Sequence, residues 1–219
     1  MTTQIEPERI RQLNDNDPNP DGRYVLYWMQ AAQRAEHNPA LELAAQRANE
    51  HGVPLVVSVV VVPDYPDASA RHFAFMLGGL GRTLSALQRR SIRVCLRVGD
   101  PVERVLSLSA DATEVVLDRG YLRHQVRWYE ALSESIDVIV TQVEGEVVVP
   151  IDEVSDAAEY AARTIRPKIN SLRDRYVVTL EPTTVKNTTT PQGTTSDIDV
   201  ASLADPPALQ ELLADLAVP

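Results

Sequence analysis

Apolar, β-branched runs alternate with amphipathic segments between Tyr24 and about Val149, and this alternation restricts the fold more than any other feature. The run LVVSVVVV at 55–62 has no polar alternation, which is typical of an inner strand covered on both faces. After it, Phe73, Leu77 and Leu80 recur at helical spacing, which predicts a long amphipathic helix. Strands that alternate with helices favour a parallel sheet between two helical layers, so the sequence predicts an α/β fold.

Five runs are predicted to be strands: 23–29, 55–62, 92–98, 114–117 and 136–143. The run at 92–98 alternates, with Arg93, Cys95 and Arg97 on one face, which predicts an edge strand with a wet face. Helices are predicted to begin at Asn38-Pro39 and Asp100-Pro101, because a polar N-cap followed by proline satisfies the first turn. A further helix is predicted from about 156 to 175.

The chain is predicted to divide into three parts: an extension at 1–22, the α/β domain at 23–176 and a tail at 177–219. Threonines gather between 183 and 195 around Pro191 and Gly193, which predicts a flexible linker. A short helix at 206–217 follows, capped by Asp205. Its leucine stripe must be buried, either on the domain itself or on a partner. That stripe comprises Leu209, Leu212, Leu213 and Leu216.

Charge and composition argue against several classes of protein. With 31 acidic and 21 basic residues the net charge is −10, which gives no support for counterion-release binding to DNA. A basic strip at 163–175 either contacts phosphates or complements its helix dipole. The longest apolar run, 54–63, is far below the roughly 20 residues that cross a bilayer. No secretory signal pattern is present, so we expect a cytoplasmic protein. A single cysteine and 4 histidines without HxH or HExxH spacing disfavour a metal site.

Ligands of parallel sheets bind beyond the carboxyl ends of the strands, so the residues after each run are the candidates for a site. These are Trp28-Met29-Gln30, Asp64-Tyr65 and Asp118-Arg119-Gly120-Tyr121, which suit a planar heterocycle but are also ordinary loop residues. Gly78, Gly79 and Gly81 follow a helical pattern rather than a strand, which indicates close helix packing instead of a phosphate loop. His72 and His124 are expected on solvated helical faces.

Four segments together resemble the N-terminal antenna domain of class II cyclobutane pyrimidine dimer photolyases. They are YVLYWMQAAQRAEHNPAL at 24–41, DYPDASARHFAFMLGGL at 64–80, DRGYLR at 118–123 and EYAARTIRPKI at 159–169. The resemblance runs from about Gln12 to Ile169, and LQELLADLAVP at 209–219 looks like the interdomain linker of that family. It implies a Rossmann-like, doubly wound sheet of five parallel strands.

The same resemblance implies a light-harvesting role. In several members this domain holds 8-hydroxy-5-deazaflavin and passes excitation energy to FAD, which sits in an all-helical C-terminal domain. We expect this chain to be without that domain. The chain is therefore expected to be part of a deoxyribodipyrimidine photolyase (a carbon-carbon lyase), not competent for repair alone, with no catalytic residue of its own. Its partner would be an FAD-binding photolyase domain, supplied in trans or lost by truncation, and its contact with DNA would be only indirect.

Strand-end positions within the matched segments give the expected pigment site. Trp28, Met29, Tyr65 and Tyr121 are predicted to form its walls. Gly120 would allow close backbone approach. The residues predicted to hydrogen-bond the polar edges are Gln30, Asn38, Asp64, Asp118 and Arg119.

Two other functions remain open at this point. The chain would be a non-catalytic interaction module if its leucine stripe docks a separately encoded helical FAD domain. A small nucleotide-binding protein of the stress type has a similar sheet, but it uses a glycine-rich phosphate loop that this sequence lacks.

Overall fold

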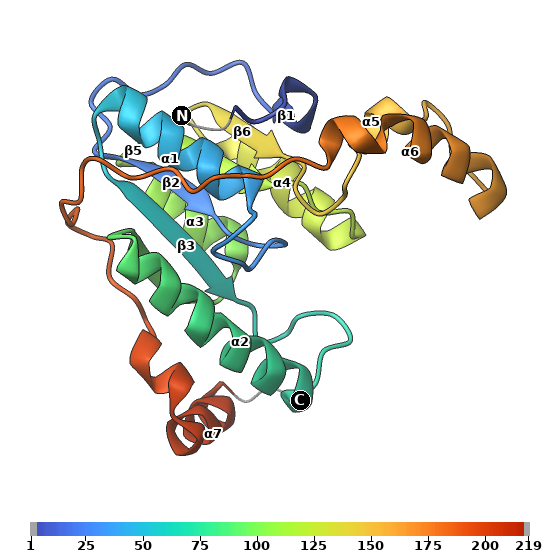
Figure 1. Ribbon diagram of the computed structural model, residues 1–219. Coiled ribbons are helices and arrows are strands. Elements are labelled where there is room, and N and C mark those ends of the chain that lie inside the picture. The colour runs from blue at the N-terminus through green and yellow to red at the C-terminus, as the bar shows by residue number, and fades with distance from the viewer. Residues whose placement is uncertain (1–3, 217–219) are drawn as a thin grey trace.

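The computed structural model describes residues 4–216, which form a six-stranded sheet with helices on both faces (Figure 1). The strand order is β1-β6-β5-β2-β3-β4. The bounds are Ile10–Gln12 (β1), Tyr24–Trp28 (β2), Leu55–Val61 (β3), Arg93–Val98 (β4), Ala112–Asp118 (β5) and Val140–Val143 (β6). The predicted α/β fold and its five parallel strands are confirmed. The sixth strand, β1, pairs antiparallel with β6 and was missed because its 3 residues, IRQ, carry no apolar run.

The last predicted strand is shorter than its apolar run. Strand β6 begins at Val140, whereas the run begins at Ile136. Side chains of the N-terminal segment hydrogen-bond the backbone carbonyls at 136–138. The Asn14 side chain donates to the Val138 carbonyl at 2.9 Å, and that of Asn16 donates to the Ile136 carbonyl at 2.7 Å.

The helices lie in two layers. Helices α1 (Pro39–His51) and α2 (Ala70–Arg89) cover one face, and α3 (Pro101–Ser109) and α4 (Arg123–Ser135) cover the other. Two predicted caps are present, because the Asn38 side chain accepts from the Leu41 N–H and that of Asp100 accepts from the Val102 and Glu103 N–H groups. The third is wrong in part: Asp205 stands at the N-cap of the C-terminal helix, but its side chain makes no capping hydrogen bond. Alternate residues of β2 enter the two cores, with Leu26 and Trp28 on the α3–α4 side.

The segment after β6 differs from the single helix predicted at 156–175. It contains the short helix α5 (Ile151–Val154), an irregular loop and then α6 (Ala162–Tyr176). The loop is held by polar side chains: the Ser155 hydroxyl donates to Glu159 at 3.0 Å, and Lys168 donates to Ser155 at 3.1 Å. Such side-chain bonds offer the chain an alternative to helix, which delays the start of α6.

The tail follows a fixed course rather than that of a flexible linker. Its residues lie against the outer edge of β4, where the Leu96 carbonyl accepts from the Asp197 N–H at 2.7 Å and the Ser196 hydroxyl accepts from the Leu96 N–H at 2.9 Å. The tail covers this sheet edge and Cys95 is fully buried, whereas Arg93 and Arg97 of the expected wet face remain half-buried. An edge strand needs such cover, since its unpaired backbone groups would otherwise invite pairing with another chain.

The C-terminal elements pack against α2. These are the 3-10 helix η2 (Val200–Ala204) and α7 (Pro206–Asp215). A Cβ on Gly81 would lie 2.9 Å from the Leu203 Cβ, so the glycine permits close packing of η2, as the sequence indicated. The leucine stripe of α7 packs on the same core, which favours the first of its two predicted occupants, the domain itself. The predicted helix end at 217 lies outside the described residues.

The buried phenol of Tyr24 makes the fold sensitive to alkaline pH. It is 2% exposed, donates to the Leu108 carbonyl at 2.6 Å, and burial raises its pKa to about 12. Because the folded-state pKa is raised, its contribution to stability is complete below the ordinary value of 10.0 and is lost as pH rises to about 12.

We expect Tyr24→Phe to remove this sensitivity. Between pH 10 and about 12 the free energy of unfolding of the wild type should fall, relative to the variant, by roughly 1.4 kcal/mol per pH unit. Urea unfolding of both proteins at a series of pH values measures the difference. Parallel pH profiles would contradict the assignment, since the other buried tyrosines are common to both proteins.

Candidate functional site

A cavity of about 320 Å³ opens at the carboxyl edge of the sheet, where sequence reasoning places ligand sites. It lies between the ends of β2 and β3, the loop at 62–69, the start of α2 and the start of α4. Its lining residues are Gln30, Gln33, Val60, Val62, Tyr65, Pro66, Asp67, Ala68, His72, Phe73, Met76 and Gln125.

The apolar walls come from strand β3 and helix α2. Val60 and Val62 stand at the end of β3, and Phe73 and Met76 face the cavity from the first turns of α2. The start of this helix is fixed by a capping box in which the Ser69 N–H donates to His72 Nδ1 at 3.0 Å. His72 is exposed, as the sequence predicted, and it also caps the helix at the cavity rim.

Three glutamines supply the amide groups of the lining, whose polar part also includes Asp67 and His72. Gln125 is 7% exposed, and its Oε1 accepts from the Leu122 N–H at 3.2 Å, which fixes the amide plane. The Gln33 amide donates a long hydrogen bond, 3.4 Å, to the Gln30 carbonyl. Each amide carries both a donor and an acceptor, so the three together suit a ligand whose edge alternates N–H and C=O groups.

Tyr65 is held as a wall of the cavity by two residues of α4. Its hydroxyl lies 2.8 Å from His124 Nε2, and its ring makes edge contacts with His124 and Trp128 at centroid distances of 4.8 and 6.0 Å. Burial raises the pKa of the Tyr65 phenol above its ordinary value of 10.0. His124 thus has an aromatic and hydrogen-bonding role, which differs from the expected solvated face.

Of the ten residues predicted for the site, Gln30 and Tyr65 line the cavity. Trp28 and Met29 are fully buried at the end of β2, one in each core layer. Asp64 is exposed on the loop beside Tyr65. The other predicted residues lie outside the lining of the cavity. For Trp28 and Met29 the reason is that successive residues at a strand end point to opposite faces.

Asp118 and Asn38 hold the loop that carries Gln30. One oxygen of Asp118 accepts from the N–H groups of Gln30, Ala31 and Ala32 at 2.9, 3.0 and 3.0 Å, and the other accepts from the Tyr27 hydroxyl at 2.7 Å. Burial raises the pKa of the Asp118 carboxyl, and these hydrogen bonds oppose that rise. The Asn38 amide donates to the Ala32 carbonyl at 3.0 Å, so the two side chains act on the same loop.

Arg119, Gly120 and Tyr121 belong to a neighbouring cluster. Arg119 pairs with Asp152 at 2.7 Å and with Glu144 at 3.4 Å, and the Tyr121 hydroxyl donates to Glu144. A Cβ on Gly120 would lie 2.8 Å from the Tyr129 hydroxyl and would clash with the Gln125 amide. The glycine therefore makes room for side chains of α4, where close approach to a ligand was predicted.

Sequence reasoning missed Phe73, Met76, Gln33 and Gln125 as lining residues. The helical periodicity that contains Phe73 was assigned to the core alone, although the first turn of a helix that follows a strand end also faces the edge site. The two glutamines carry no motif, and only their positions next to predicted strand ends or helix starts mark them. Within residues 4–216 no cluster of three or more His, Cys, Asp or Glu side chains is arranged to hold a metal ion.

Comparison with known sequences identifies a family. The model of the family described as DNA photolyase matches residues 25–189. The deoxyribodipyrimidine photo-lyase of Methanothermobacter thermautotrophicus is 40% identical over 182 residues, which cover 83% of this chain and 41% of that protein. The Arabidopsis thaliana protein of the same name is 32% identical over 184 residues, covering 81% of this chain and 37% of that one. The chain thus spans about two-fifths of the length of these relatives.

Solved structures share the fold. A class III photolyase from Agrobacterium tumefaciens superposes with a TM-score of 0.64 at 18% identity, over 82% of this chain and 38% of that one. A Sulfolobus tokodaii photolyase, described with two FAD molecules and a novel light-harvesting cofactor, gives 0.59 at 16% identity, over 88% of this chain and 41% of that one. At these identities the likeness shows the fold alone.

Proposed function

The chain belongs to the DNA photolyase family and corresponds to its N-terminal α/β domain, and we propose that it is the light-harvesting domain of a deoxyribodipyrimidine photolyase. The observation that carries this proposal is the edge cavity, which combines aromatic and apolar walls with three amide side chains. The four segments matched in the sequence support a finer assignment to class II. Repair of DNA is proposed for the complete photolyase, in which FAD is held by polypeptide that this chain does not span.

The residues of the cavity fit a planar tricyclic pigment. The volume of the cavity, about 320 Å³, lies at the lower end of the range of small-molecule pockets, roughly 300–1,000 Å³. Tyr65 and Phe73 would hold the ring, and Gln30, Gln33 and Gln125 would hydrogen-bond its polar edges. We propose a deazaflavin of the 8-hydroxy-5-deazaflavin type, which when bound supplies absorption of light and transfer of the excitation. The chain's own task is to orient the pigment and exclude water.

Filling the cavity tests this proposal. We expect Met76→Trp to weaken pigment binding at least tenfold, about 1.4 kcal/mol, because the larger side chain occupies the space of the ring. Titration of the full chain with 8-hydroxy-5-deazaflavin, followed by absorption and fluorescence, measures the dissociation constant. A parallel titration with FAD distinguishes the two pigments.

Phe75→Trp is the matched control, because Phe75 neighbours Met76 on α2 but is 87% exposed. Its dissociation constant should remain within about twofold of the wild-type value. Absence of saturable binding of both pigments by the wild type would refute a light-harvesting role. Equal binding by Met76→Trp and the wild type would show that the pigment binds at another place on the chain.

A further inference from the structure

Helix α6 projects from the body of the domain, as the orange helix at the right of Figure 1 shows. It is anchored mainly near its C-terminal end. Tyr176 is 4% exposed beneath the Arg9 guanidinium, whose central carbon lies 5.3 Å from the ring centroid, and Arg175 pairs with Glu8. The first turns of α6 and the loop before it extend toward solvent, and Tyr160 in that loop is 96% exposed.

An apolar hollow of about 570 Å³ lies between α5 and α6. We call it the α5–α6 hollow, and its lining residues are Val147, Val148, Val149, Ile151, Val154, Ser155, Ala157, Ala158, Glu159, Ile165 and Ile169. Val148 is 54% exposed and Ile151 41%, although both are aliphatic. Contiguous exposed apolar surface of this kind marks an interaction site in a folded protein.

Charged side chains border the hollow. Ile165 and Ile169 face it from α6, and Arg166 and Lys168 flank them at helical spacing. Lys168 is paired with Glu159 at 2.5 Å, whereas Arg166 is exposed and makes no ion pair within the described part of the chain. Glu159 also lines the hollow, and α5 carries Asp152 and Glu153, so the margin holds charges of both signs. An apolar centre with a polar margin favours a partner surface that is apolar in the middle and polar at its edge.

We propose that the α5–α6 hollow docks the part of a photolyase polypeptide that this chain does not span. The match covers only 41% of the M. thermautotrophicus relative, so more than half of that protein lies outside the matched region. Elsewhere the tail and α7 already cover the outer edge of β4 and the side of α2, which leaves the hollow as an open apolar surface. Helix α5 is tied to the end of β6 through the Ile151 N–H and Glu144, at 3.2 Å. The docked polypeptide would thus sit at the sheet edge that carries the cavity.

Hydrogen–deuterium exchange of two intact proteins tests the proposal. We expect the amides of α6 (162–176) to exchange readily in this chain and the matching segment of the full-length M. thermautotrophicus relative to show protection factors at least about tenfold higher. Helix α1 (39–51), whose inner face is buried in this chain, is the internal control, and its protection should change little. Equal protection of α6 in the two proteins would overturn the proposal. The exchange measurement needs no pigment, so failure of the docking proposal can be distinguished from failure of the proposed light-harvesting role.

Two further measurements decide between occupants. If α6 protection in this chain rises with protein concentration, a second copy fills the hollow and the proposed occupant is wrong. The double variant Ile165→Asp, Ile169→Asp should leave the Tm of this chain within about 2 °C of wild type, because the hollow is open. A large loss of Tm would show that the chain closes the hollow itself, which also overturns the proposal.

The same two substitutions, made at the aligned positions of the full-length relative, should abolish the extra protection of the segment that matches α6.

Discussion

Replacing Asp118 with alanine is expected to lower the free energy of unfolding by about 3–5 kcal/mol. The carboxylate is 2% exposed and accepts from three backbone N–H groups of the loop at 30–32 and from the Tyr27 hydroxyl. Removal of the acceptor leaves these donors without partners in a site that water reaches poorly, and each such group costs about 1–3 kcal/mol. Urea unfolding at neutral pH measures the change.

Asp64→Ala is the control for this prediction. Asp64 also follows a strand, but it is exposed, so its replacement should change stability by no more than about 0.5 kcal/mol. Because the loop at 30–32 carries Gln30, Asp118→Ala should also weaken pigment binding if the cavity holds the pigment. An Asp118→Ala protein as stable as the wild type would show that the loop does not depend on this carboxylate.

Replacing Arg90 with alanine is expected to cost a similar amount, about 3–5 kcal/mol, because it leaves the carboxylate of Glu42 buried without its cation. Glu42 is 2% exposed and accepts from Arg90 at 2.9 and 3.0 Å. Arg90 also donates to the Thr183 carbonyl at 3.1 Å, and Glu42 accepts from the Thr183 N–H. The pair therefore joins α1, the end of α2 and the tail.

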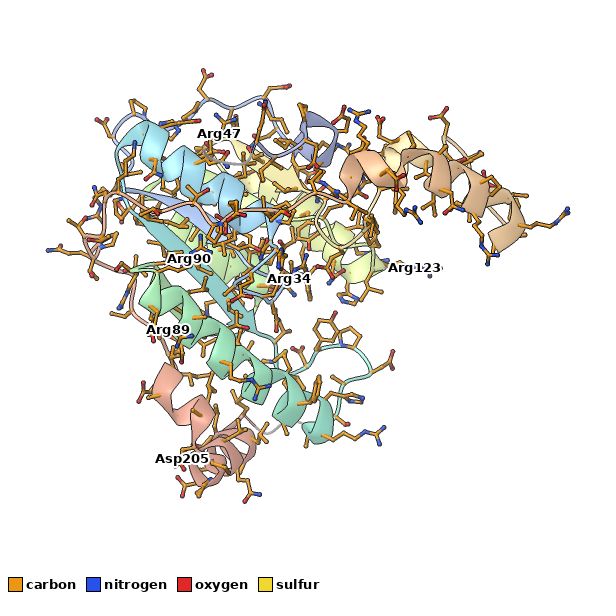
Figure 2. All side chains as sticks on the ribbon, viewed as in Figure 1. Arg34, Arg47, Arg89, Arg90, Arg123 and Asp205 are labelled. Carbon is orange, nitrogen blue, oxygen red and sulfur yellow. The ribbon has the colours of Figure 1, made fainter. Side chains whose placement is uncertain are left out.

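Loss of this pair should release the tail before the domain unfolds. Limited proteolysis of Arg90→Ala is expected to cut the segment at 183–195 faster than in the wild type, alongside the lower unfolding free energy. Arg89→Ala is the matched control: Figure 2 labels both arginines at the end of α2, but Arg89 is exposed whereas Arg90 is half-buried and pairs with Glu42. If the two variants behave alike, the tail is held by its other contacts.

The local sequence determined the elements and their order. Strand β3 follows from an apolar, β-branched run without polar alternation. The helices at Pro39 and Pro101 follow from N-caps that bond only two or three residues ahead. Four segments in register were enough to identify the photolyase family. Each of these signals acts within one element or its cap, where backbone hydrogen bonding and side-chain period are set by neighbours in the chain.

The tertiary structure alone decided the site and the course of the tail. Asp118 meets the loop at 30–32 across 86 to 88 residues, and Glu42 meets Thr183 across 141. Strand ends indicated the correct edge of the sheet and two lining residues, Gln30 and Tyr65, but not Phe73 or Gln125, which helices from elsewhere in the chain bring there. The threonine-rich composition predicted flexibility, yet hydrogen bonds to β4 and α1 fix the tail. Such contacts depend on how layers pack, and neither periodicity nor composition encodes that.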